Sequence, residues 1–425
     1  MSEKRFTVAV VGGGAAGMMA AAVAARAGAK VCLVEKNEKL GKKLYLTGKG
    51  RCNVTNVGTT DAESDGGKEA FFANIVSNPK FLYSAFAAFD HRSVLRFLEE
   101  AGCRLKVERG GRVFPVSDHS SDVIAALHGE LKKRRVEILL NRKAEEVLAC
   151  GSAPALRVRG IRLADGKVLP ADRVILATGG LTYPSTGSDG DGYRFARRLG
   201  HQLVPCRPAL APLRIAEGWC RELAGLSLKN VSLRLIVETK TVFSGFGEML
   251  FTHFGVSGPL VLTASSFYAK QGGAQGRLLI DLKPALTLEE LERRLARDFE
   301  EHGRKQFQNA LRGLFPARLI PVMVRLSGIV PEKSCREISR KERLVFARAI
   351  QNVPLTVAAG GEYREAVITQ GGVSVKDVNP STMESRLVSG LYFAGEVLDL
   401  DALTGGFNLQ IAWSTGALAG RRASC

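Results

Sequence analysis

The sequence predicts an α/β protein in which both ends of the chain build one parallel sheet and further domains are inserted between them. Three observations lead to this fold class: a buried strand with a glycine-rich loop at the start, a similar strand and turn near position 180, and a third strand, turn and helix at the end. The 425 residues suffice for two or three domains, and the 45% apolar and 24% charged shares are typical of globular proteins.

The first element is a strand over Phe6–Val11, a nearly continuous apolar run of the kind that buried parallel strands show. It leads into the glycine-rich loop Gly12–Gly17 and a helix over about 15–27. Gly12 permits the tight turn, Gly14 lets the backbone approach a pyrophosphate, and Gly17 lets the helix pack closely on the sheet. Because free N–H groups at the helix start face the phosphates, this loop predicts a dinucleotide site. Its expected residues are Gly12, Gly14, Ala15, Ala16 and Gly17.

The second strand, residues 30–34, ends in Glu35, about 20 residues beyond the glycine loop. A carboxylate at this spacing accepts hydrogen bonds from the adenosine ribose of a bound dinucleotide. A glutamate that is merely solvated is the alternative, but the order strand, loop, helix, strand favours the ribose contact.

Periodicity continues the α/β pattern through the first part of the chain. Residues 57–68 read as a polar surface loop, and 79–101 has helical spacing. A strand over 136–140 precedes a hairpin that turns at Asp165-Gly166, and residues 174–180 form a buried strand that ends in Thr-Gly-Gly.

The pattern of apolar and polar residues changes after position 192. Residues 210–281 alternate in short segments typical of a β-rich domain, 286–326 is helical and basic, and the nucleotide-domain pattern returns near Pro354. The expected domains are a nucleotide-binding domain in two parts, 1–193 and 355–425, a β-rich insertion, 194–284, a helical subdomain, 285–328, and a return segment of the insertion, 329–354.

The end of the chain holds the second strong motif. Residues 391–394 read as a buried strand that ends at Gly395-Glu396, and the turn at Gly405-Gly406 leads through Phe407 and Asn408 into a helix that continues to about residue 419. A helix N-terminus carries about half a positive charge. It therefore suits the N1–C2=O edge of a flavin, where two-electron reduction places negative charge. An ordinary helix start at a glycine turn is the alternative.

A third motif, Gly41–Asn56, combines glycines, two Asn, one Arg and one Cys in a way that a protein core does not need. Such a run is typical of a loop that lines a planar, hydrogen-bonding ring. Gly50, Arg51 and Asn53 are its expected contacts. Cys52 is either a thiol acid or a small wall residue, and for a lone cysteine the structural role is the commoner one.

Two further segments carry candidate residues. His253 lies between Thr252 and a glycine-rich turn and is one of only six His, so it is either a proton donor or substrate contact, or a structural histidine. Phe114 either packs on a ring or belongs to the core. The six His are scattered and the eight Cys form no CxxC pair, so we expect no metal site and reduced thiols.

The net charge of +18 and a sequence pI near 9.7 favour a polyanionic partner, although a solvated basic surface explains them as well. No segment is typical of a membrane span, because Arg26 interrupts the alanine-rich helix. Residues 1–5 lead directly into the first strand, so we expect no signal peptide and a cytoplasmic location.

Together these motifs resemble those of the BaiN/RdsA-type FAD-binding flavoproteins, also described as aminoacetone oxidase-like. The resemblance runs nearly from end to end, and the strings Gly-Arg-Cys-Asn and Thr-His-Phe-Gly-Val-Ser-Gly-Pro are specific. The matching segments are Gly12–Gly17, Gly41–Asn56, Gly111–Ser117, Ala177–Gly180, Met249–Pro259 and Gly390–Gly416.

The resemblance implies a Rossmann-like FAD-binding domain formed from both termini, an inserted β-barrel-like domain and a small helical subdomain. It also implies non-covalent FAD. A second dinucleotide fingerprint is missing from the sequence, so NAD(P)H would dock transiently as electron donor. The remaining cofactor contacts expected are Lys36, Lys42, Cys52, Ala144, Thr178, Gly179, Gly395, Glu396, Gly405, Gly406, Phe407 and Asn408.

One branch of this family resembles an rRNA dihydrouridine synthase acting on 23S rRNA, and another resembles an NAD(P)H-dependent reductase of unsaturated steroid-type substrates. Both reactions add hydride to a C=C bond conjugated to a carbonyl and need a proton donor, for which His253 and then Cys52 are the candidates. We expect reduction of a uridine in 23S rRNA or its precursor particle. The alternatives are a reductase or oxidase of a small unsaturated or amine substrate, and a ribosome-associated flavoprotein without catalysis.

Overall fold

The computed structural model describes residues 6–58, 66–152 and 156–425. The chain forms two compact units: unit 1 holds Met1–Pro208 and Val367–Cys425, and unit 2 holds Ala209–Ala366. The boundaries lie 12 to 15 residues beyond those expected at 193/194 and 354/355. The reason is pairing, since β10 (Leu203–Ala209) pairs with β17 (Ile368–Val373) of unit 1, whereas β16 (Val353–Ala359) is a barrel strand of unit 2.

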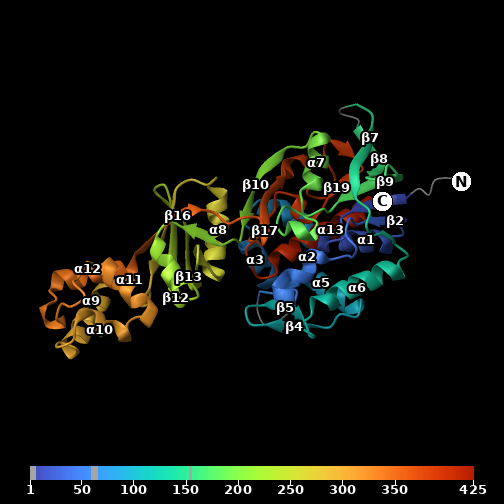
Figure 1. The fold of residues 1–425 in the computed structure, drawn as a ribbon. Helices are drawn as coiled ribbons and strands as arrows, with labels where there is room; N and C mark the ends of the chain where they lie inside the picture. The colour runs from blue at the N-terminus through green and yellow to red at the C-terminus, as the bar shows by residue number, and fades with distance from the viewer. Residues whose placement is uncertain (1–5, 59–65, 153–155) are drawn as a thin grey trace. The chain divides into compact units, whose positions relative to one another are not determined.

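Unit 1 contains a sheet whose parallel part joins the two ends of the chain (Figure 1). β1 (Phe6–Val11) lies between β2 (Val31–Val34) and β9 (Val168–Leu176), and β6 (Glu137–Leu139) lies beyond β2. β19 (Leu391–Phe393), from the end of the sequence, pairs in parallel with β9. The predicted α/β class, with a sheet formed from both termini, is confirmed.

An antiparallel extension continues this sheet. β7 (Ala144–Cys150) and β8 (Leu156–Leu163) pair antiparallel, β8 pairs antiparallel with β9, and β18 (Val388–Ser389) adds a short parallel pairing to β8. The turn between β8 and β9 lies at Asp165-Gly166 as predicted, with the Gly166 N–H donating to the Leu163 carbonyl at 2.9 Å.

Helices α1 (Ala15–Arg26) and α13 (Phe407–Ala423) pack against each other through very small residues. A Cβ atom added at Gly416 would lie 2.5 Å from the Ala16 carbonyl oxygen, and one added at Gly420 would lie 2.3 Å from that of Ala20. This close approach explains why both helices are rich in Ala and Gly, and it fixes the end of the chain against the glycine loop at its beginning.

The other elements of unit 1 surround this sheet. Residues 66–68 of the predicted surface loop begin a helix instead, and residues 59–65 of that loop lie outside the described part of the chain. The small antiparallel sheet β3-β5-β4 lies in the same unit. The bounds are α2 (Lys42–Leu46), α3 (Gly66–Ala73), α4 (Tyr83–Ala88), α5 (His91–Glu100), α6 (Ser120–Lys133), α7 (Asp191–Arg198), β3 (Thr55–Asn56), β4 (Leu105–Glu108) and β5 (Arg112–Pro115).

Unit 2 begins with a closed antiparallel barrel in the order β11-β14-β13-β12-β15-β16 (Figure 1). Side chains along β12 alternate between the buried interior and the exposed outer face, as the sequence pattern predicts. Helix α8 (Pro259–Lys270) packs against β12 and β13 and was not foreseen in this β-rich region. The other strands are β11 (Leu213–Ile215), β12 (Ser227–Val237), β13 (Lys240–Thr252), β14 (Gly255–Ser257) and β15 (Gly276–Asp281).

The helical part of unit 2 has its own aromatic core. Phe307 lies edge-on to Phe346, with ring centroids 5.2 Å apart, and Phe299 packs on Phe307 at 5.9 Å. Its helices are α9 (Leu288–Glu301), α10 (Phe307–Ala310), α11 (Ile320–Ser327) and α12 (Arg340–Gln351). Across the described parts of both units, no helix is long and apolar enough to cross a membrane.

Candidate flavin site

The motifs predicted from the sequence meet at one edge of the parallel sheet in unit 1. β1, β2, β9 and β19 run in parallel, so their carboxyl ends lie at the same edge. In open α/β sheets ligands bind outside this edge. The residues that follow the four strand ends are Gly12, Glu35, Ala177 with Thr178, and Ala394 with Gly395.

The glycine loop is tightly packed at two positions and open at a third. A Cβ at Gly12, where φ is +105°, would lie 2.5 Å from the Ala177 carbonyl oxygen, and one at Gly17 would lie 1.8 Å from the Gly12 oxygen. A Cβ at Gly14 would meet no atom of the described chain within 4 Å. Gly14 also precedes α1 without a side-chain cap, so the first N–H groups of the helix point into this open space. The loop therefore forms a cradle for an anionic group.

Glu35 is buried and held in place at the end of β2. Its Oε2 accepts a hydrogen bond from the Gly13 N–H at 2.7 Å, and its Oε1 accepts from the backbone and side-chain N–H groups of Asn37 at 2.8 and 2.7 Å. Oε2 accepts only this one bond within the described chain and has a second lone pair, so Glu35 remains suited to a ribose hydroxyl.

Other predicted contacts lie near this edge with partners of their own. Lys36 pairs with Asp189 at 2.6 Å and with Asp191 at 2.8 Å. Ala144 is buried at the start of β7, opposite Leu163. These pairings fix the backbone around residues 36 and 144. Both residues would therefore contact a cofactor through their main-chain groups.

The C-terminal loop is folded by its own asparagine and by one from the third motif. Asn408 Nδ2 donates to the Ala402 carbonyl at 2.7 Å, and its Oδ1 accepts from the Ala402 N–H at 2.9 Å. Asn56 Nδ2 donates to the Gly405 carbonyl at 3.1 Å. Gly406, at φ +102°, precedes α13 without a side-chain cap. The N-terminus of α13 therefore presents uncapped N–H groups, as expected of a flavin-contacting helix.

A charged network connects the third motif to the last strand. Lys43 Nζ donates to Glu396 Oε2 at 2.7 Å and to Thr182 Oγ1 at 2.6 Å. Glu396 Oε1 accepts from the Thr369 N–H at 2.9 Å. Lys42, the expected cofactor contact, pairs with Glu38 at 3.2 Å, and its contact with a cofactor stays a prediction. Lys43 was not foreseen in this network, because adjacent lysines in a short helix differ only in the direction each side chain takes.

The Arg51 side chain is part of an ion-pair network. Its guanidinium pairs with Glu108 and with Asp118, and it lies 4.1 Å from the Phe114 ring centroid. The hydrogen bond from Arg51 lowers the pKa of Glu108. Arg51 thus joins the loop of residues 48–53 to the β4–β5 hairpin, and Phe114 is buried beneath it.

Cys52 is fully buried and adopts a left-handed conformation, with φ +59°. Burial raises the pKa of its thiol to about 12, so the group stays protonated and neutral near pH 7. These surroundings favour Cys52 as a small residue that lines the site over Cys52 as a proton donor, because a general acid works best when its pKa lies near the working pH.

Two buried polar atoms test whether this site fits a flavin dinucleotide. Asn53 Oδ1 and Thr178 Oγ1 have no hydrogen-bond partner among the described residues. A buried polar atom left without a partner costs about 1–3 kcal/mol. Both atoms belong to predicted cofactor contacts, and they accompany the open cradle at Gly14. The residues present therefore fit a polar dinucleotide cofactor.

We expect Thr178→Val, which keeps the side-chain shape, to separate stability from cofactor binding. The variant should raise the melting temperature of the apoprotein, because it removes an unpaired buried hydroxyl, and lower FAD affinity by about tenfold. Thermal melts of the apoprotein and FAD titration by flavin fluorescence measure the two effects. Thr178→Ser is the control and should retain FAD affinity; equal affinity in the Val variant would contradict the contact.

His253 lies in unit 2, at the turn between β13 and β14, and its side chain is exposed. Its ring packs edge-on against Phe254 with centroids 4.8 Å apart, and the Arg214 guanidinium lies 5.0 Å from the Phe254 centroid. The hydroxyl of Thr252 is buried and has no partner in the described chain. The turn therefore presents an accessible imidazole on a fixed support.

The parallel sheet, the open glycine cradle and the uncapped α13 together define a Rossmann-type FAD-binding fold of the FAD-dependent oxidoreductase class. The comparison with protein families then identifies the particular group. The chain belongs to the HI0933-like family, whose HI0933-like protein Rossmann domain matches residues 6–422.

The names of relatives that are similar over nearly the whole chain describe two different activities. The 3-dehydro-bile acid delta(4,6)-reductase of Clostridium scindens is 34% identical over 421 residues, 98% of each chain. The ribosomal RNA dihydrouridine synthase of Escherichia coli K12 is 30% identical over 412 residues, 97% of this chain and 96% of the relative. The enzyme of the same name from Haemophilus influenzae is 29% identical, over 96% and 95% of the two chains.

Solved structures agree on the fold alone. The 3-ketosteroid delta1-dehydrogenase of Sterolibacterium denitrificans is 15% identical with a TM-score of 0.55, covering 99% of both chains. The 3-ketosteroid-delta4-(5alpha)-dehydrogenase of Rhodococcus jostii is 16% identical with a TM-score of 0.52, covering 99% of this chain and 97% of the other.

Proposed function

We propose that this protein is an FAD-dependent, cytoplasmic reductase that converts a uridine of 23S rRNA, or of its precursor particle, to dihydrouridine, with NAD(P)H as electron donor. The observation that carries the proposal is the similarity over 97% of the chain to a ribosomal RNA dihydrouridine synthase, combined with a net charge of +18. Such a charge attracts a polyanion much more strongly than it attracts the single carboxylate of a bile acid.

The basic charge is concentrated in the helical part of unit 2. Residues 304–348 contain eleven Lys and Arg against three Glu and no Asp. Seven of these cations have exposed side chains that form neither an ion pair nor a hydrogen bond within the described residues, so their charge is available to phosphates. They are Arg304, Lys305, Arg312, Arg336, Arg340, Lys341 and Arg348.

FAD, when bound and reduced, supplies the hydride that adds to C6 of uracil. The chain's own groups hold the reactants. The uncapped N–H groups at the start of α13 would stabilise negative charge at the cofactor's pyrimidine edge. Asn53 Oδ1 and Thr178 Oγ1, which have no partner in the described chain, would hydrogen-bond to its polar groups. Glu396 and Thr182 orient the Lys43 ammonium, whose remaining N–H is available to a carbonyl group.

We assign the proton for C5 of the uracil to His253. The residue is exposed at a turn, so its ring N–H groups are accessible to a substrate, and His is the side chain that acts most often as a general acid. The buried, neutral Cys52 remains the second candidate, and its raised pKa makes it the weaker acid.

A second function keeps the same chemistry with a small substrate. The relative of 34% identity is a bile acid reductase, and hydride addition to a steroid-type enone needs the same cofactor and the same proton donor. Turnover of unsaturated carbonyl compounds with NADPH, together with unchanged rRNA modification in a deletion strain, would favour this function.

Mass-spectrometric mapping of dihydrouridine in 23S rRNA tests the proposed function directly. We expect cells lacking this gene to lose one dihydrouridine, and a plasmid copy to restore it. Purified protein with FAD and NADPH should form the same modification on rRNA from the deletion strain. An unchanged dihydrouridine map in the deletion strain would refute the proposal.

A further inference from the structure

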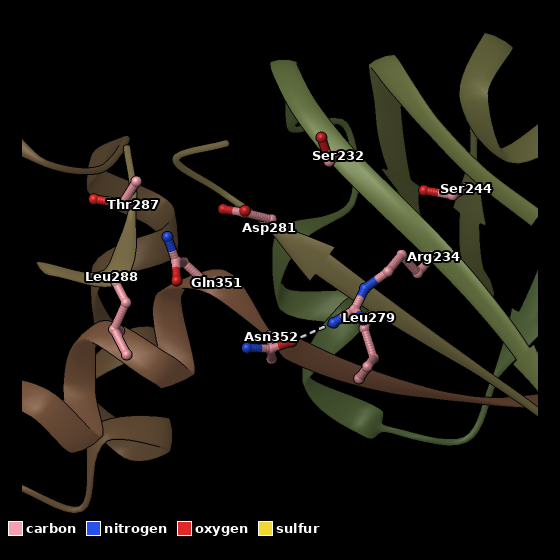
Figure 2. Close-up of a pocket in the computed structure, with 9 residues that line it drawn as sticks. All are labelled: Ser232, Arg234, Ser244, Leu279, Asp281, Thr287, Leu288, Gln351 and Asn352. Atoms are coloured by element: carbon pink, nitrogen blue, oxygen red, sulfur yellow. Dashed lines mark hydrogen bonds between the residues drawn. The ribbon is translucent and has the colours of Figure 1, made fainter. Parts of the chain in front are cut away.

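Unit 2 contains a cleft of about 350 Å³ that no step of the proposed reaction uses. Its one wall is the outer face of the barrel, formed by β12, β13 and β15, and its other wall is formed by the start of α9 and the end of α12 (Figure 2). This volume is within the usual range of small-ligand pockets. The walls are polar, so the cleft is suited to a ligand with several hydrogen-bonding groups.

One cation and one carboxylate face this cleft with unused capacity. Arg234 Nη2 donates to Asn352 Oδ1 at 2.6 Å, which leaves its Nε and Nη1 groups without a partner in the described chain. Asp281 Oδ1 accepts from the Lys283 N–H at 2.8 Å, and Oδ2 has no partner there. Ser232 pairs with Asp281 and Arg234 with Leu279, so Arg234 and Asp281 are diagonal neighbours, about 7–8 Å apart.

An exposed aromatic residue is the cross-strand neighbour of Ser232, which lines the cleft. Phe246 is directly opposite Ser232 in the β12–β13 pairing, so both side chains stand on the outer face of the barrel. The Phe246 side chain is 64% exposed, the most exposed of the large hydrophobic residues in the described chain. A ring left in solvent next to an arginine is typical of surfaces on which single-stranded nucleic acid stacks its bases.

These three groups match the three parts of a ribonucleotide. A guanidinium binds phosphate, a carboxylate accepts a hydrogen bond from a ribose hydroxyl, and an aromatic face stacks on a base. The ribose contact discriminates, because only RNA has the 2′-hydroxyl. Arg234 and Phe246 alone would not distinguish RNA from DNA, whereas Asp281 would repel a nearby phosphate that brought no hydroxyl with it.

We propose that this cleft binds one unpaired nucleotide of single-stranded RNA, with its phosphate at Arg234, its 2′-hydroxyl at Asp281 and its base on Phe246. The inference rests on the proposed function for its choice of RNA over a free ribonucleotide. The basic segment 304–348 of the same unit supports that choice, since a single nucleotide does not need so many cations. The bound nucleotide is a recognition element, separate from the uridine that is reduced.

The test compares matched RNA and DNA oligonucleotides, labelled and single-stranded, by fluorescence anisotropy with the FAD-loaded full chain. We expect Arg234→Gln and Phe246→Ser each to weaken binding of both by about tenfold, and Arg234→Gln also to reduce the salt dependence by about one ion. Asp281→Asn should weaken RNA binding by about tenfold and leave DNA binding equal or stronger, because the variant removes a negative charge near the phosphate. Arg221→Gln, an exposed arginine of unit 2 outside the cleft, is the control and should bind as wild type.

Wild-type RNA binding in all three variants would overturn the proposal. So would variants that bind RNA normally but lose NADP⁺ in a calorimetric titration, since the cleft would then hold a ribonucleotide cofactor. Melting temperatures identify any variant that misfolds. If Asp281→Asn is unstable, the variants of Arg234 and Phe246, whose side chains are exposed, still test the proposal. Dihydrouridine mapping remains a separate readout: loss of RNA binding in the variants supports the cleft even if no uridine is modified.

Discussion

An alanine at position 14 should leave the apoprotein folded and reduce its affinity for FAD by at least about tenfold. Gly14 has an extended backbone, with φ −82°, which alanine adopts without strain. The added methyl group would meet no atom of the described chain within 4 Å. It would instead occupy the cradle at the start of α1, where the pyrophosphate must approach the backbone. Equilibrium dialysis with FAD and thermal melting of the apoprotein measure the two properties independently.

Two other glycines are matched controls for this variant. Gly17→Ala places its Cβ 1.8 Å from the Gly12 oxygen, so we expect the fold itself to lose about 3 kcal/mol or more. Gly129→Ala, in the middle of α6, meets nothing and should stabilise the protein by up to about 1 kcal/mol with normal FAD affinity. Normal FAD affinity in Gly14→Ala would place the cofactor elsewhere.

The local motifs were predictable because their chemistry depends on a few adjacent residues. The glycine spacing of 12–17 determines a turn at Gly12, close packing of the helix at Gly17 and the helix start after Gly14, and all three lie where the sequence predicted them. Helix ends were less accurate: the last helix, expected over about 408–419, runs from Phe407 to Ala423. Its additional turn packs through Gly420 on Ala20, a contact between the two ends of the chain that no local pattern encodes.

Long-range partners could not be predicted. Thr369 donates its N–H to Glu396 and accepts from the Leu181 N–H at 2.8 Å, yet it lies in a fully buried strand, β17, without any motif. Helix α8 was missed because alternating segments surround it, although Pro259 at its first turn was an available signal. Local sequence patterns therefore predict loops and helix starts more readily than the distant residues that hydrogen-bond to them.

The largest kinetic effect is expected at His253. We expect His253→Ala to slow reoxidation of the reduced flavin by RNA in single-turnover experiments by about 100- to 10,000-fold, the usual contribution of a general acid. Reduction of the flavin by NAD(P)H should stay unchanged, because that step needs no proton on uracil. Stopped-flow absorbance of the flavin follows both half-reactions.

Two variants distinguish this role from a structural one. His302→Ala removes an imidazole from the end of α9 in the same unit and should leave both half-reactions at wild-type rates. Cys52→Ser tests the second candidate. Because the Cys52 thiol is buried and its pKa is near 12, we expect this variant to retain most of the wild-type rate of flavin reoxidation. A slow Cys52→Ser with a fast His253→Ala would reverse the assignment.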